Sequence, residues 1–351
     1  MPSPKPDPVI VLIPVHDDWL ALGQLLPLLG QAMSRSNRDC QVLVVDDGSI
    51  LAMPPELGAR PLAGIRRIDV LRLRRNLGHQ RAIAVGLCFA QEEMPAHTLV
   101  VMDGDGEDDP FDVPRLLDRL ESASAPVCVF AERRRRAEGP LFRGFYWLYR
   151  LAHRVLTGLP VRIGNFSALP RILARRLTTA SDLWNHYAAT VVKSRLPIAT
   201  IPTRRGKRLA GESRMNFVGL VAHGLSAISV FSDRVGVRLL LGTTIASLAL
   251  LVLVVAAVMV RVATPLAIPG WATSTVGLLC VLLVQAIILS FVFVFMVLSG
   301  REASSFLPAR DYRFFVEGLT PLWPKSDTST PDPNSSFSHP LRAGSRTSGD
   351  G

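Results

Sequence analysis

The first part of the chain repeats a pattern in which short runs of β-branched and aliphatic residues alternate with longer amphipathic runs. The short runs have the length of strands, and the longer ones have the spacing of helices that bury one face. Such alternation is typical of βαβ units, so it predicts an α/β domain over residues 8–213, with a mostly parallel sheet and helices on both faces. The expected strands are residues 9–14, 41–46, 68–73, 98–103 and 127–131, and the expected helices are 19–34, 78–91 and 113–122.

Farther along, residues 239–260 and 271–299 form two apolar runs without a charged residue. Each is long enough to supply the roughly 20 residues that cross a bilayer core as a helix. The short turn 261–270 joins them, so they predict a hairpin of two transmembrane helices, at about 239–260 and 272–299, within residues 237–300. Buried helices of a soluble protein are the alternative, but two such runs are hard to bury.

The charges around the two runs indicate an orientation. The turn between them carries Arg261, whereas both flanks carry several arginines. By the positive-inside rule both flanks are expected in the cytoplasm, and a bacterial inner membrane is the expected location. The stretch 9–15 is too short for a signal peptide and ends in acidic residues, so we expect no cleaved leader. The flanking arginines are Arg234 and Arg238 before the hairpin and Arg301, Arg310 and Arg313 after it.

The remaining segments are less regular. Residues 1–7 are rich in proline, and residues 321–351 are rich in Ser, Thr, Pro and Asn, so both are expected to be disordered. Residues 214–236 and 301–320 are expected to be juxtamembrane segments, the first of them amphipathic. Residues 141–156 mix aromatic residues with arginines, which favours a helix in the headgroup region, with a core-packed helix as the alternative.

Charge and composition narrow the partners. The net charge of +10 favours contact with anionic lipid, phosphorylated substrates or nucleic acid, and the hydrophobic share of 48% excludes disorder of the whole chain. The four cysteines are widely scattered, without the spacing of a zinc site, and are expected to be reduced core residues. They are Cys40, Cys88, Cys128 and Cys280.

Acidic residues follow several of the expected strands. The most acidic stretch is 103–110, in which Asp103 and Asp105 are separated by Gly104. Two carboxylates at this spacing can bind one Mg²⁺ or Mn²⁺, which commonly adds substrate phosphates as further ligands. A solvated acidic turn is the alternative, and a calcium loop is disfavoured because Pro110 follows at once. No GxGxxG or P-loop follows a strand, so the expected ligand is a metal-bound diphosphate.

Several motifs in order along residues 8–300 resemble those of family 2 glycosyltransferases of the GT-A fold. With the hairpin, they resemble the polyprenyl-phosphate glycosyltransferase branch of that family. The resemblance implies that a sugar moves from a nucleotide-diphospho-sugar to a polyprenyl phosphate, with no role for nucleic acid. The motifs begin at Val11 (VLIPVHDD), Val44 (VVDDGS), Arg75 (RNLGHQRA), Val101 (VMDGD) and Arg208 (RLAGESR).

The resemblance also implies roles for individual acidic and polar residues. Pro14, His16 and Asp18 would line the base and ribose, and Asp46 and Asp47 would lie near the base. Asp103, Gly104, Asp105 and Glu107 would meet the diphosphate, with Asp103 and Asp105 on the metal. The chain departs from the family where His16 replaces an aromatic residue, Asp18 a glutamate, Glu107 a glutamine, and Asn165 to Ser167 an Asp-Phe-Arg sequence.

Basic residues complete the expected site. By the same resemblance, Arg208 and Arg214 would contact donor and acceptor phosphates, and Arg133, the first of the run 133–136, would bind a phosphate. Asp105, Arg133 and Arg208 are therefore the expected catalytic residues. For the arginine run, a loop on anionic lipid is the alternative, and for Arg81 a solvated position is favoured over one facing the site.

The expected reaction is an in-line displacement with inversion. A lipid phosphate is largely dianionic at neutral pH, its second pKa being near ~6, so it needs little help from a general base. A processive polysaccharide synthase is one rival, but the chain has two expected spans and lacks the Gln-x-x-Arg-Trp motif. A membrane-tethered binding or scaffold protein without activity is the other. A homo-oligomer is compatible with the sequence.

Overall fold

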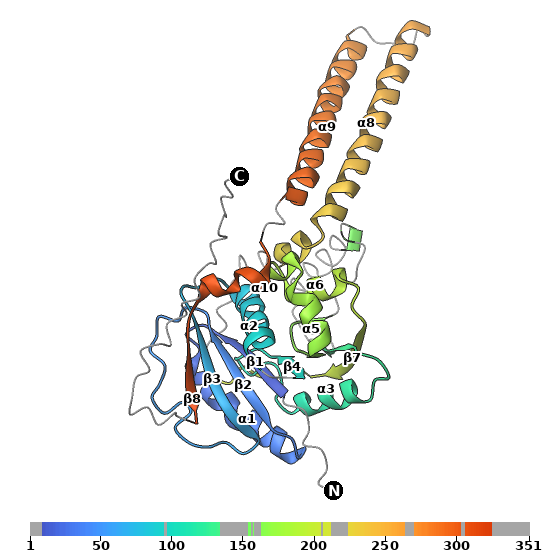
Figure 1. The fold of residues 1–351 in the computed structure, drawn as a ribbon. Coiled ribbons are helices and arrows are strands. Elements are labelled where there is room, and N and C mark those ends of the chain that lie inside the picture. The colour runs from blue at the N-terminus through green and yellow to red at the C-terminus, as the bar shows by residue number, and fades with distance from the viewer. Residues whose placement is uncertain are drawn as a thin grey trace, which may run out of the picture.

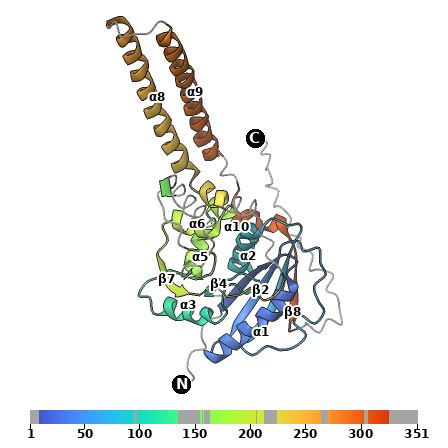
Figure 2. The same cartoon turned by 180° about the vertical axis from the view of Figure 1, so that it is seen from behind.

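The computed structural model describes residues 9–94, 97–133, 154–155, 157, 163–204, 206–211, 224–263, 270–302 and 306–324. The described residues form an α/β domain from which two long helices extend together (Figures 1 and 2). The expectations for residues 1–7, Arg214, the end of the run 133–136, almost all of 141–156 and the tail after 324 lie outside the described residues.

The sheet of the described part has eight strands in the order β7-β5-β6-β4-β1-β2-β3-β8. The neighbours β1–β2, β1–β4, β2–β3 and β5–β7 are parallel, while β6 and β8 run antiparallel to their neighbours. The strands are β1 Val9–Val15, β2 Cys40–Asp46, β3 Ile65–Leu73, β4 Thr98–Val101, β5 Cys128–Arg133, β6 Ser167–Pro170, β7 Ile198–Thr203 and β8 Val316–Trp323.

Helices cover both faces of this sheet, as the sequence pattern predicted. Val11 and Ile13 of β1 point into a core shared with α1 and α3, whereas Ile10 and Leu12 point into a core shared with α2, α5 and α6. This alternation is the period of two expected for a strand that is buried on both faces. The helices of the domain are α1 Trp19–Arg35, α2 His79–Glu93, α3 Asp112–Glu121, α5 Arg171–Thr178, α6 Tyr187–Lys193 and α10 Pro308–Asp311, with 3-10 turns η1 Ser181–Trp184 and η3 Tyr312–Phe315.

One glycine allows α2 to lie close to the sheet. A Cβ atom on Gly86 would stand 2.6 Å from side-chain carbons of both Leu12 on β1 and Val45 on β2. Such contacts are too short for any larger residue, so Gly86 sets the distance between α2 and the strands whose ends form the site described below.

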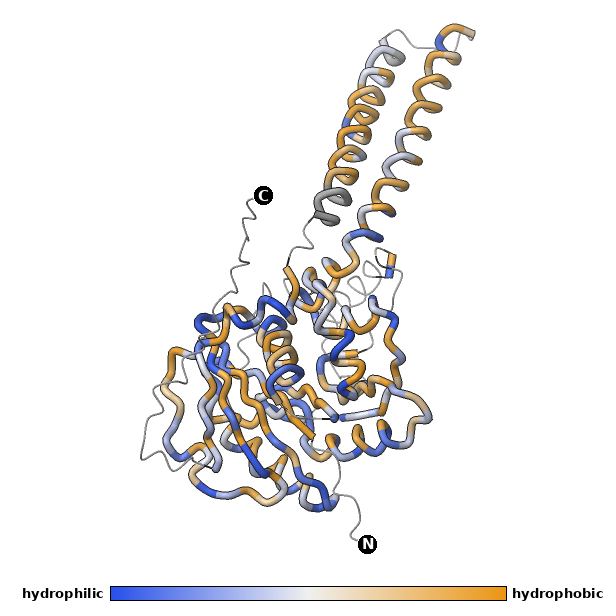
Figure 3. The backbone as a smooth tube through the Cα atoms, in the orientation of Figure 1, coloured by the Kyte–Doolittle hydropathy of each residue, from blue (hydrophilic) through white to orange (hydrophobic). Residues whose placement is uncertain are grey.

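The hairpin consists of α8 Ser232–Ala263 and α9 Trp271–Glu302, so both helices extend beyond the expected spans. Both are long and apolar enough to cross a membrane. Figure 3 shows that hydrophobic residues predominate along both helices. The Ser290 hydroxyl on α9 donates a hydrogen bond to the Thr243 hydroxyl on α8 at 2.8 Å, which links the two helices. Cys280 is exposed on α9, so its prediction as a core residue was wrong, whereas Cys40, Cys88 and Cys128 are buried.

The chain after the hairpin returns to the domain, which differs from the expected juxtamembrane segment 301–320 and tail from 321. β8 pairs antiparallel with β3, from Leu73 opposite Val316 to Ile68 opposite Trp323. The strand was missed because its partner lies far away in sequence, and because it is a partly exposed edge strand with a glycine and a proline. Residues 306–324 therefore belong to the α/β domain.

Candidate active site

The carboxyl ends of β1, β2 and β4 meet at one edge of the sheet, where ligands bind in folds of this kind. The register pairs Val15 with Asp46, which brings residues 16–18 beside residues 47–49. The Met102 N–H donates to the Leu12 carbonyl at 3.1 Å, so the acidic loop that follows β4 begins at the same edge. The sheet thus gathers three of the motifs predicted to form the site.

His16 bridges two of these strand ends. Asn76 is fixed in orientation because its Oδ1 accepts the Gly78 N–H at 2.9 Å, and its Nδ2 then donates to His16 Nε2 at 3.0 Å. His16 Nδ1 lies 3.0 Å from the Asp47 carbonyl, which can only accept. The geometry therefore selects the tautomer with the proton on Nδ1, and the imidazole takes a defined orientation.

Asp17, next to His16, ties the same loops together. Its backbone is left-handed, with φ of 54°, and its Oδ1 accepts the N–H groups of Ile50 and Leu51, both at 2.7 Å. The Asp17 N–H donates to the Ser49 hydroxyl at 2.8 Å. Sequence reasoning gave Asp17 no role, although aspartate is among the few residues that tolerate this conformation.

Asp46 and Asp47, predicted as a pair near the base, have different surroundings. Asp47 is buried and accepts the N–H groups of Leu77 and Gly78 at the start of α2. Burial raises the pKa of Asp47, and the two hydrogen bonds partly offset this. The Asp46 Oδ1 accepts the Ser49 N–H at 2.9 Å, and its Oδ2 lies 3.7 Å from Arg72 Nε. Asp46 lines a cavity of about 390 Å³ beside the ends of β2 and β3.

Gly48, between these two acidic residues and Ser49, is required by the close approach of another loop. Its φ is +65°, and a Cβ atom there would stand 2.5 Å from the Asn76 nitrogen. The segment that carries Asn76 can therefore pass directly over the turn after β2.

The acidic loop is folded on itself. The Asp103 N–H donates to Asp108 Oδ2 at 3.1 Å, and the Glu107 N–H donates to Asp105 Oδ1 at 2.9 Å. A Cβ atom on Gly104 would stand 3.2 Å from the Pro14 carbonyl oxygen and from carbons of Ile13 and Val15. Gly104 therefore brings the loop close to the end of β1.

His79, the first residue of α2, lies against the acidic loop. Its Nε2 is 3.2 Å from Asp103 Oδ1. Desolvation lowers the pKa of His79, but the charge and hydrogen bond of Asp103, together with Asp108 and Asp105, outweigh it and raise the pKa overall. His79 belongs to the motif that begins at Arg75, but no role was predicted for it from the sequence.

A chain of polar contacts connects His79, the first residue of α2, with Tyr187, the first residue of α6. The Tyr187 N–H donates to Gln80 Oε1 at 2.8 Å, which leaves Gln80 Nε2 to donate to Asn165 Oδ1 at 3.2 Å. The Asn165 Nδ2 then lies 3.1 Å from His79 Nε2. Asn165, which replaces the aspartate of the family pattern, thus accepts from Gln80, and its Nδ2 faces the same His79 nitrogen that lies near Asp103. That nitrogen accepts from Asn165 only without a proton and donates to Asp103 only with one.

Arg208 joins two of the predicted carboxylates. Its guanidinium forms ion pairs with Asp18, through Nη2, and with Asp105, through Nη1 at 3.2 Å. Its Nε donates to the Ala210 carbonyl at 3.0 Å. All three charged side chains are about one fifth exposed, so their attraction is less screened than at the open surface. Asp18, which was predicted to line the base and ribose, therefore contacts Arg208.

The other basic residues named in the sequence analysis are Arg133, Arg214 and Arg81. Arg133 is the last residue of β5, where its backbone pairs with Thr203 at the end of β7, directly before the segment that carries Arg208. Arg214 lies outside the described residues. The Arg81 guanidinium lies over the Trp184 ring, 5.4 Å from its centre, so in the described contacts it packs against an aromatic residue.

Within the described residues, no group of three or more His, Cys, Asp or Glu side chains is arranged to hold a metal ion. Asp103 and Asp105 offer carboxylate oxygens, which Mg²⁺ and Mn²⁺ prefer, and such ions take one or two carboxylates together with substrate phosphates. The donor set therefore fits a divalent ion whose remaining ligands come from a diphosphate and water.

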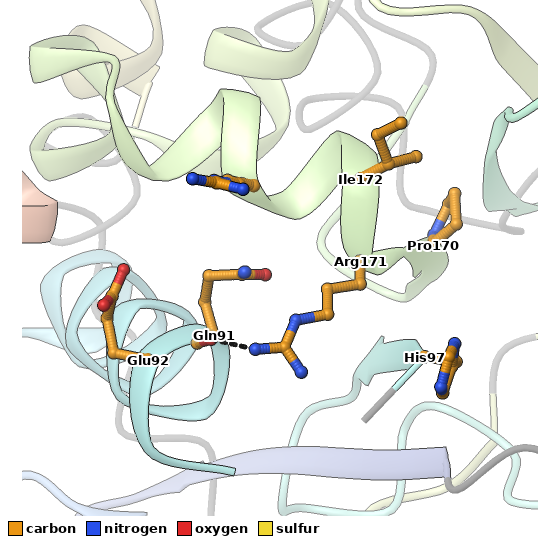
Figure 4. A pocket seen from close by; sticks show the side chains of 7 residues that line it. Gln91, Glu92, His97, Pro170, Arg171 and Ile172 are labelled. Carbon is orange, nitrogen blue, oxygen red and sulfur yellow. Dashed lines mark hydrogen bonds between the residues drawn. The ribbon is translucent and has the colours of Figure 1, made fainter. Parts of the chain in front are cut away.

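A second, larger cavity of about 610 Å³ lies near the amino end of β4 and contains none of the predicted site residues (Figure 4). Arg171 crosses it and donates to the carbonyl oxygens of Gln91, at 2.8 Å, and Met94, at 3.4 Å. These carbonyls belong to the last turn of α2 and the residue after it, so Arg171 has a structural role there.

Comparisons with known proteins agree with the motifs. The family model described as glycosyl transferase family 2 matches residues 10–178. The chain is 22% identical over 229 residues to the uncharacterized glycosyltransferase YkcC of Bacillus subtilis (strain 168), across 64% of this chain and 68% of that protein. It is 26% identical over 227 residues to the undecaprenyl-phosphate 4-deoxy-4-formamido-L-arabinose transferase of Erwinia tasmaniensis, across 61% of this chain and 64% of that protein. The match thus covers less than two thirds of the latter protein.

The solved structures that align with this chain do so at lower sequence identity. Glucosyl-3-phosphoglycerate synthase from Mycobacterium tuberculosis, in complex with Mn²⁺, UDP-glucose and phosphoglyceric acid, aligns with a TM-score of 0.47 and 16% identity, across 66% of this chain and 80% of that chain. Mannosyl-3-phosphoglycerate synthase from Rubrobacter xylanophilus aligns with a TM-score of 0.44 and 14% identity, across 65% of this chain and 74% of that chain.

Proposed function

From the premise that residues 10–178 form a family 2 glycosyltransferase domain, we propose that this protein transfers a sugar from a nucleotide-diphospho-sugar to a polyprenyl phosphate in a membrane. The observation that carries the proposal is the meeting of Asp18, Asp105 and Arg208 at the carboxyl edge of a sheet attached to two membrane-length helices. The name of the Erwinia relative, which specifies undecaprenyl phosphate, supports this class of acceptor.

The acidic half of the site would receive the donor. Asp103 and Asp105 would hold Mg²⁺ or Mn²⁺, which would neutralise negative charge on the departing nucleoside diphosphate. Pro14, His16 and Asp46 would border the nucleoside. His16 suits this position because its ring is fixed by Asn76 and by the Asp47 carbonyl.

The basic residues would orient the two phosphates. Arg208, and by the same proposal Arg133 and Arg214, carry the planar guanidinium that binds phosphate oxygens in pairs. An oxygen of the lipid phosphate would form a bond to the anomeric carbon as the bond from that carbon to the diphosphate oxygen breaks. The leaving diphosphate would take the electron pair, and the configuration at the anomeric carbon would invert.

The hairpin would hold the enzyme where its acceptor is found. β3 precedes α8 and β8 follows α9, yet the two strands pair in one sheet. Both ends of the hairpin would therefore lie on the same side of a membrane that it crosses. The arginines of the flanks favour the cytoplasmic side, so we propose a multi-pass protein of a bacterial inner membrane with a cytoplasmic catalytic domain.

The test is release of nucleoside diphosphate by the purified full chain in detergent, with a panel of UDP- and GDP-sugars, with and without polyprenyl phosphate and Mn²⁺. We expect release with one donor class, strongly increased by lipid phosphate and by Mn²⁺ and lost in Asp105→Ala. Release that lipid phosphate does not increase would contradict the proposed acceptor. If none of the donors leads to release of nucleoside diphosphate, a protein without activity is favoured.

A further inference from the structure

Two segments of the site interlock. The Gly206 N–H donates to the Glu107 carbonyl at 2.8 Å, and the Leu209 N–H donates to the Asp105 carbonyl at 2.9 Å. A Cβ atom on Gly206 would stand 2.5 Å from the Gly106 carbonyl oxygen, and one on Gly106 would stand 2.4 Å from Leu209 Cγ. We name residues 206–211 the basic segment and residues 103–109 the acidic loop; the two glycines allow their backbones to touch.

The interlocked backbones place a cation on the acidic loop. Asp105 has two carboxylate oxygens: Oδ1 accepts the Glu107 N–H, and Oδ2 lies 3.2 Å from Arg208 Nη1. The second amino group of the same guanidinium pairs with Asp18 on the loop after β1. Arg208 therefore contacts the very carboxylate oxygen that points away from the loop backbone, and Asp18 holds it in that position.

A divalent ion that binds Asp105 Oδ2 is repelled by the positive charge of Arg208 on the same oxygen. Mg²⁺ binds carboxylate oxygens at about 2.0–2.1 Å, which would bring two like-charged groups within a few ångströms of each other in a partly desolvated site. The ion must either push the guanidinium aside or bind more weakly.

We propose that Arg208 is a tethered counter-ion: in the absence of donor it occupies Asp105, and a divalent ion that binds Asp105 displaces it. The displaced guanidinium stays near the site because Asp18 and the interlocked backbone retain the basic segment, and it is then free to meet phosphate oxygens. Asp18 is in this view a positioning residue for Arg208. The inference rests on the proposed function, which assigns Asp105 to the metal.

The experiment measures Mn²⁺ binding to the full chain in detergent without nucleotide, from the electron paramagnetic resonance signal of free Mn²⁺. Arg208→Ala and Arg208→Gln should each bind Mn²⁺ at least about fivefold more tightly than the unaltered protein, because the competing cation is gone. Gly206→Ala, which keeps the charge but pushes the basic segment away, should also tighten binding. Asp105→Ala should abolish it.

Lys207→Ala is the matched control. Lys207 is exposed on the same segment, and its substitution removes one positive charge at the position next to Arg208. It should change the affinity for Mn²⁺ by less than about twofold, since it leaves the Asp105 contact intact. If Lys207→Ala and Arg208→Ala increase the affinity for Mn²⁺ equally, the effect comes from the loss of any nearby positive charge, and the inference is wrong.

The remaining outcomes separate this inference from the proposed function. If Mn²⁺ binds, Asp105→Ala abolishes binding, and the Arg208 variants bind no more tightly than the unaltered protein, the tethered counter-ion is wrong while the metal site stands. If Mn²⁺ does not bind to any of the proteins, or if Asp105→Ala binds it normally, the metal site is wrong and the inference falls with it.

Discussion

The carboxylate of Asp47 holds the first turn of α2 through Gly78, whose N–H it accepts at 2.9 Å. Gly78 has a φ of 90°, and the neighbouring Leu77 N–H donates to the same carboxylate at 2.7 Å. These N–H groups precede a helix and have no partner within it, so Asp47 satisfies them while its charge faces the positive end of α2. Asp47 therefore fixes the element that carries His79 and Gln80.

We predict that Asp47→Ala destabilises the domain by about 1–3 kcal/mol, because two backbone donors lose a buried acceptor. A fall in the thermal melting temperature of the detergent-solubilised protein would measure the loss. Glu56→Ala, at an exposed carboxylate, is the control and should leave the melting temperature nearly unchanged. If both variants melt alike, the cap is not a stabilising feature.

The difference between Asp46 and Asp47 illustrates the limit of the sequence. The motif placed both carboxylates at the carboxyl end of β2, and this was right. Which of the two faces the cavity and which lies under α2 depends on where residues 77–78 pass, and those residues come from another strand end. Likewise, Asp18 was expected to line the base and ribose, which stays a prediction, and its ion pair with Arg208 joins residues 190 positions apart that no local pattern connects.

Local patterns explain what could be predicted. The strands β1 to β4 and the helices between them follow from alternating and amphipathic runs, each read within one segment, and the two apolar runs gave the hairpin. β8 could not be found this way, because Gly318 and Pro321 weaken its strand signal and its partner β3 lies on the other side of the hairpin. The polar chain from Tyr187 to His79 could not be predicted from the sequence either, since it joins three separate segments: α2, α6 and the residues before β6.

The return of the chain to the sheet gives a prediction for Tyr312. This residue is 1% exposed, and its hydroxyl lies 3.2 Å from Glu93 Oε1 at the end of α2. Tyr312→Ala should cost about 3–5 kcal/mol, as for other large aromatic residues removed from a core. Phe314→Ala, at a side chain that is 75% exposed, should have little effect. Equal melting temperatures for the two variants would mean that residues 312–323 do not support the domain.

For the metal carboxylates, we predict that Asp105→Ala lowers turnover at least about 100-fold while the melting temperature is retained, since stabilisation of transition-state charge has effects of this size. Asp109→Asn in the same loop is the control, because Asp109 accepts the Phe111 N–H and has no assigned part in donor binding. The measurement is initial rates at saturating donor and Mn²⁺. An Asp105→Ala protein with most of its activity would remove this residue from the reaction.

The topology can be tested by cysteine labelling from outside the cell. A probe at Ala263, at the end of α8, should react, and a probe at Phe314 should not. Native thiols interfere little, because burial raises the pKa of both Cys40 and Cys128 to about 12 and also raises that of Cys88. Cys280 would be replaced by serine. If the probe at Phe314 reacts and the probe at Ala263 is protected, the orientation is the reverse of the proposed one.

Arg208 gives the sharpest test, because its two proposed roles act in opposite directions. Its loss should tighten Mn²⁺ binding and yet lower turnover by about 100-fold, even at saturating lipid phosphate in detergent, since an interaction with reacting phosphates is felt in the transition state. A basic residue that merely touched anionic lipid would add about 1 kcal/mol of membrane binding and would cost no turnover once the bilayer is replaced by detergent. Lys207→Ala measures that second kind of effect on the same segment. Turnover by Arg208→Ala equal to that of Lys207→Ala would leave Arg208 as a surface contact, whatever its effect on the metal.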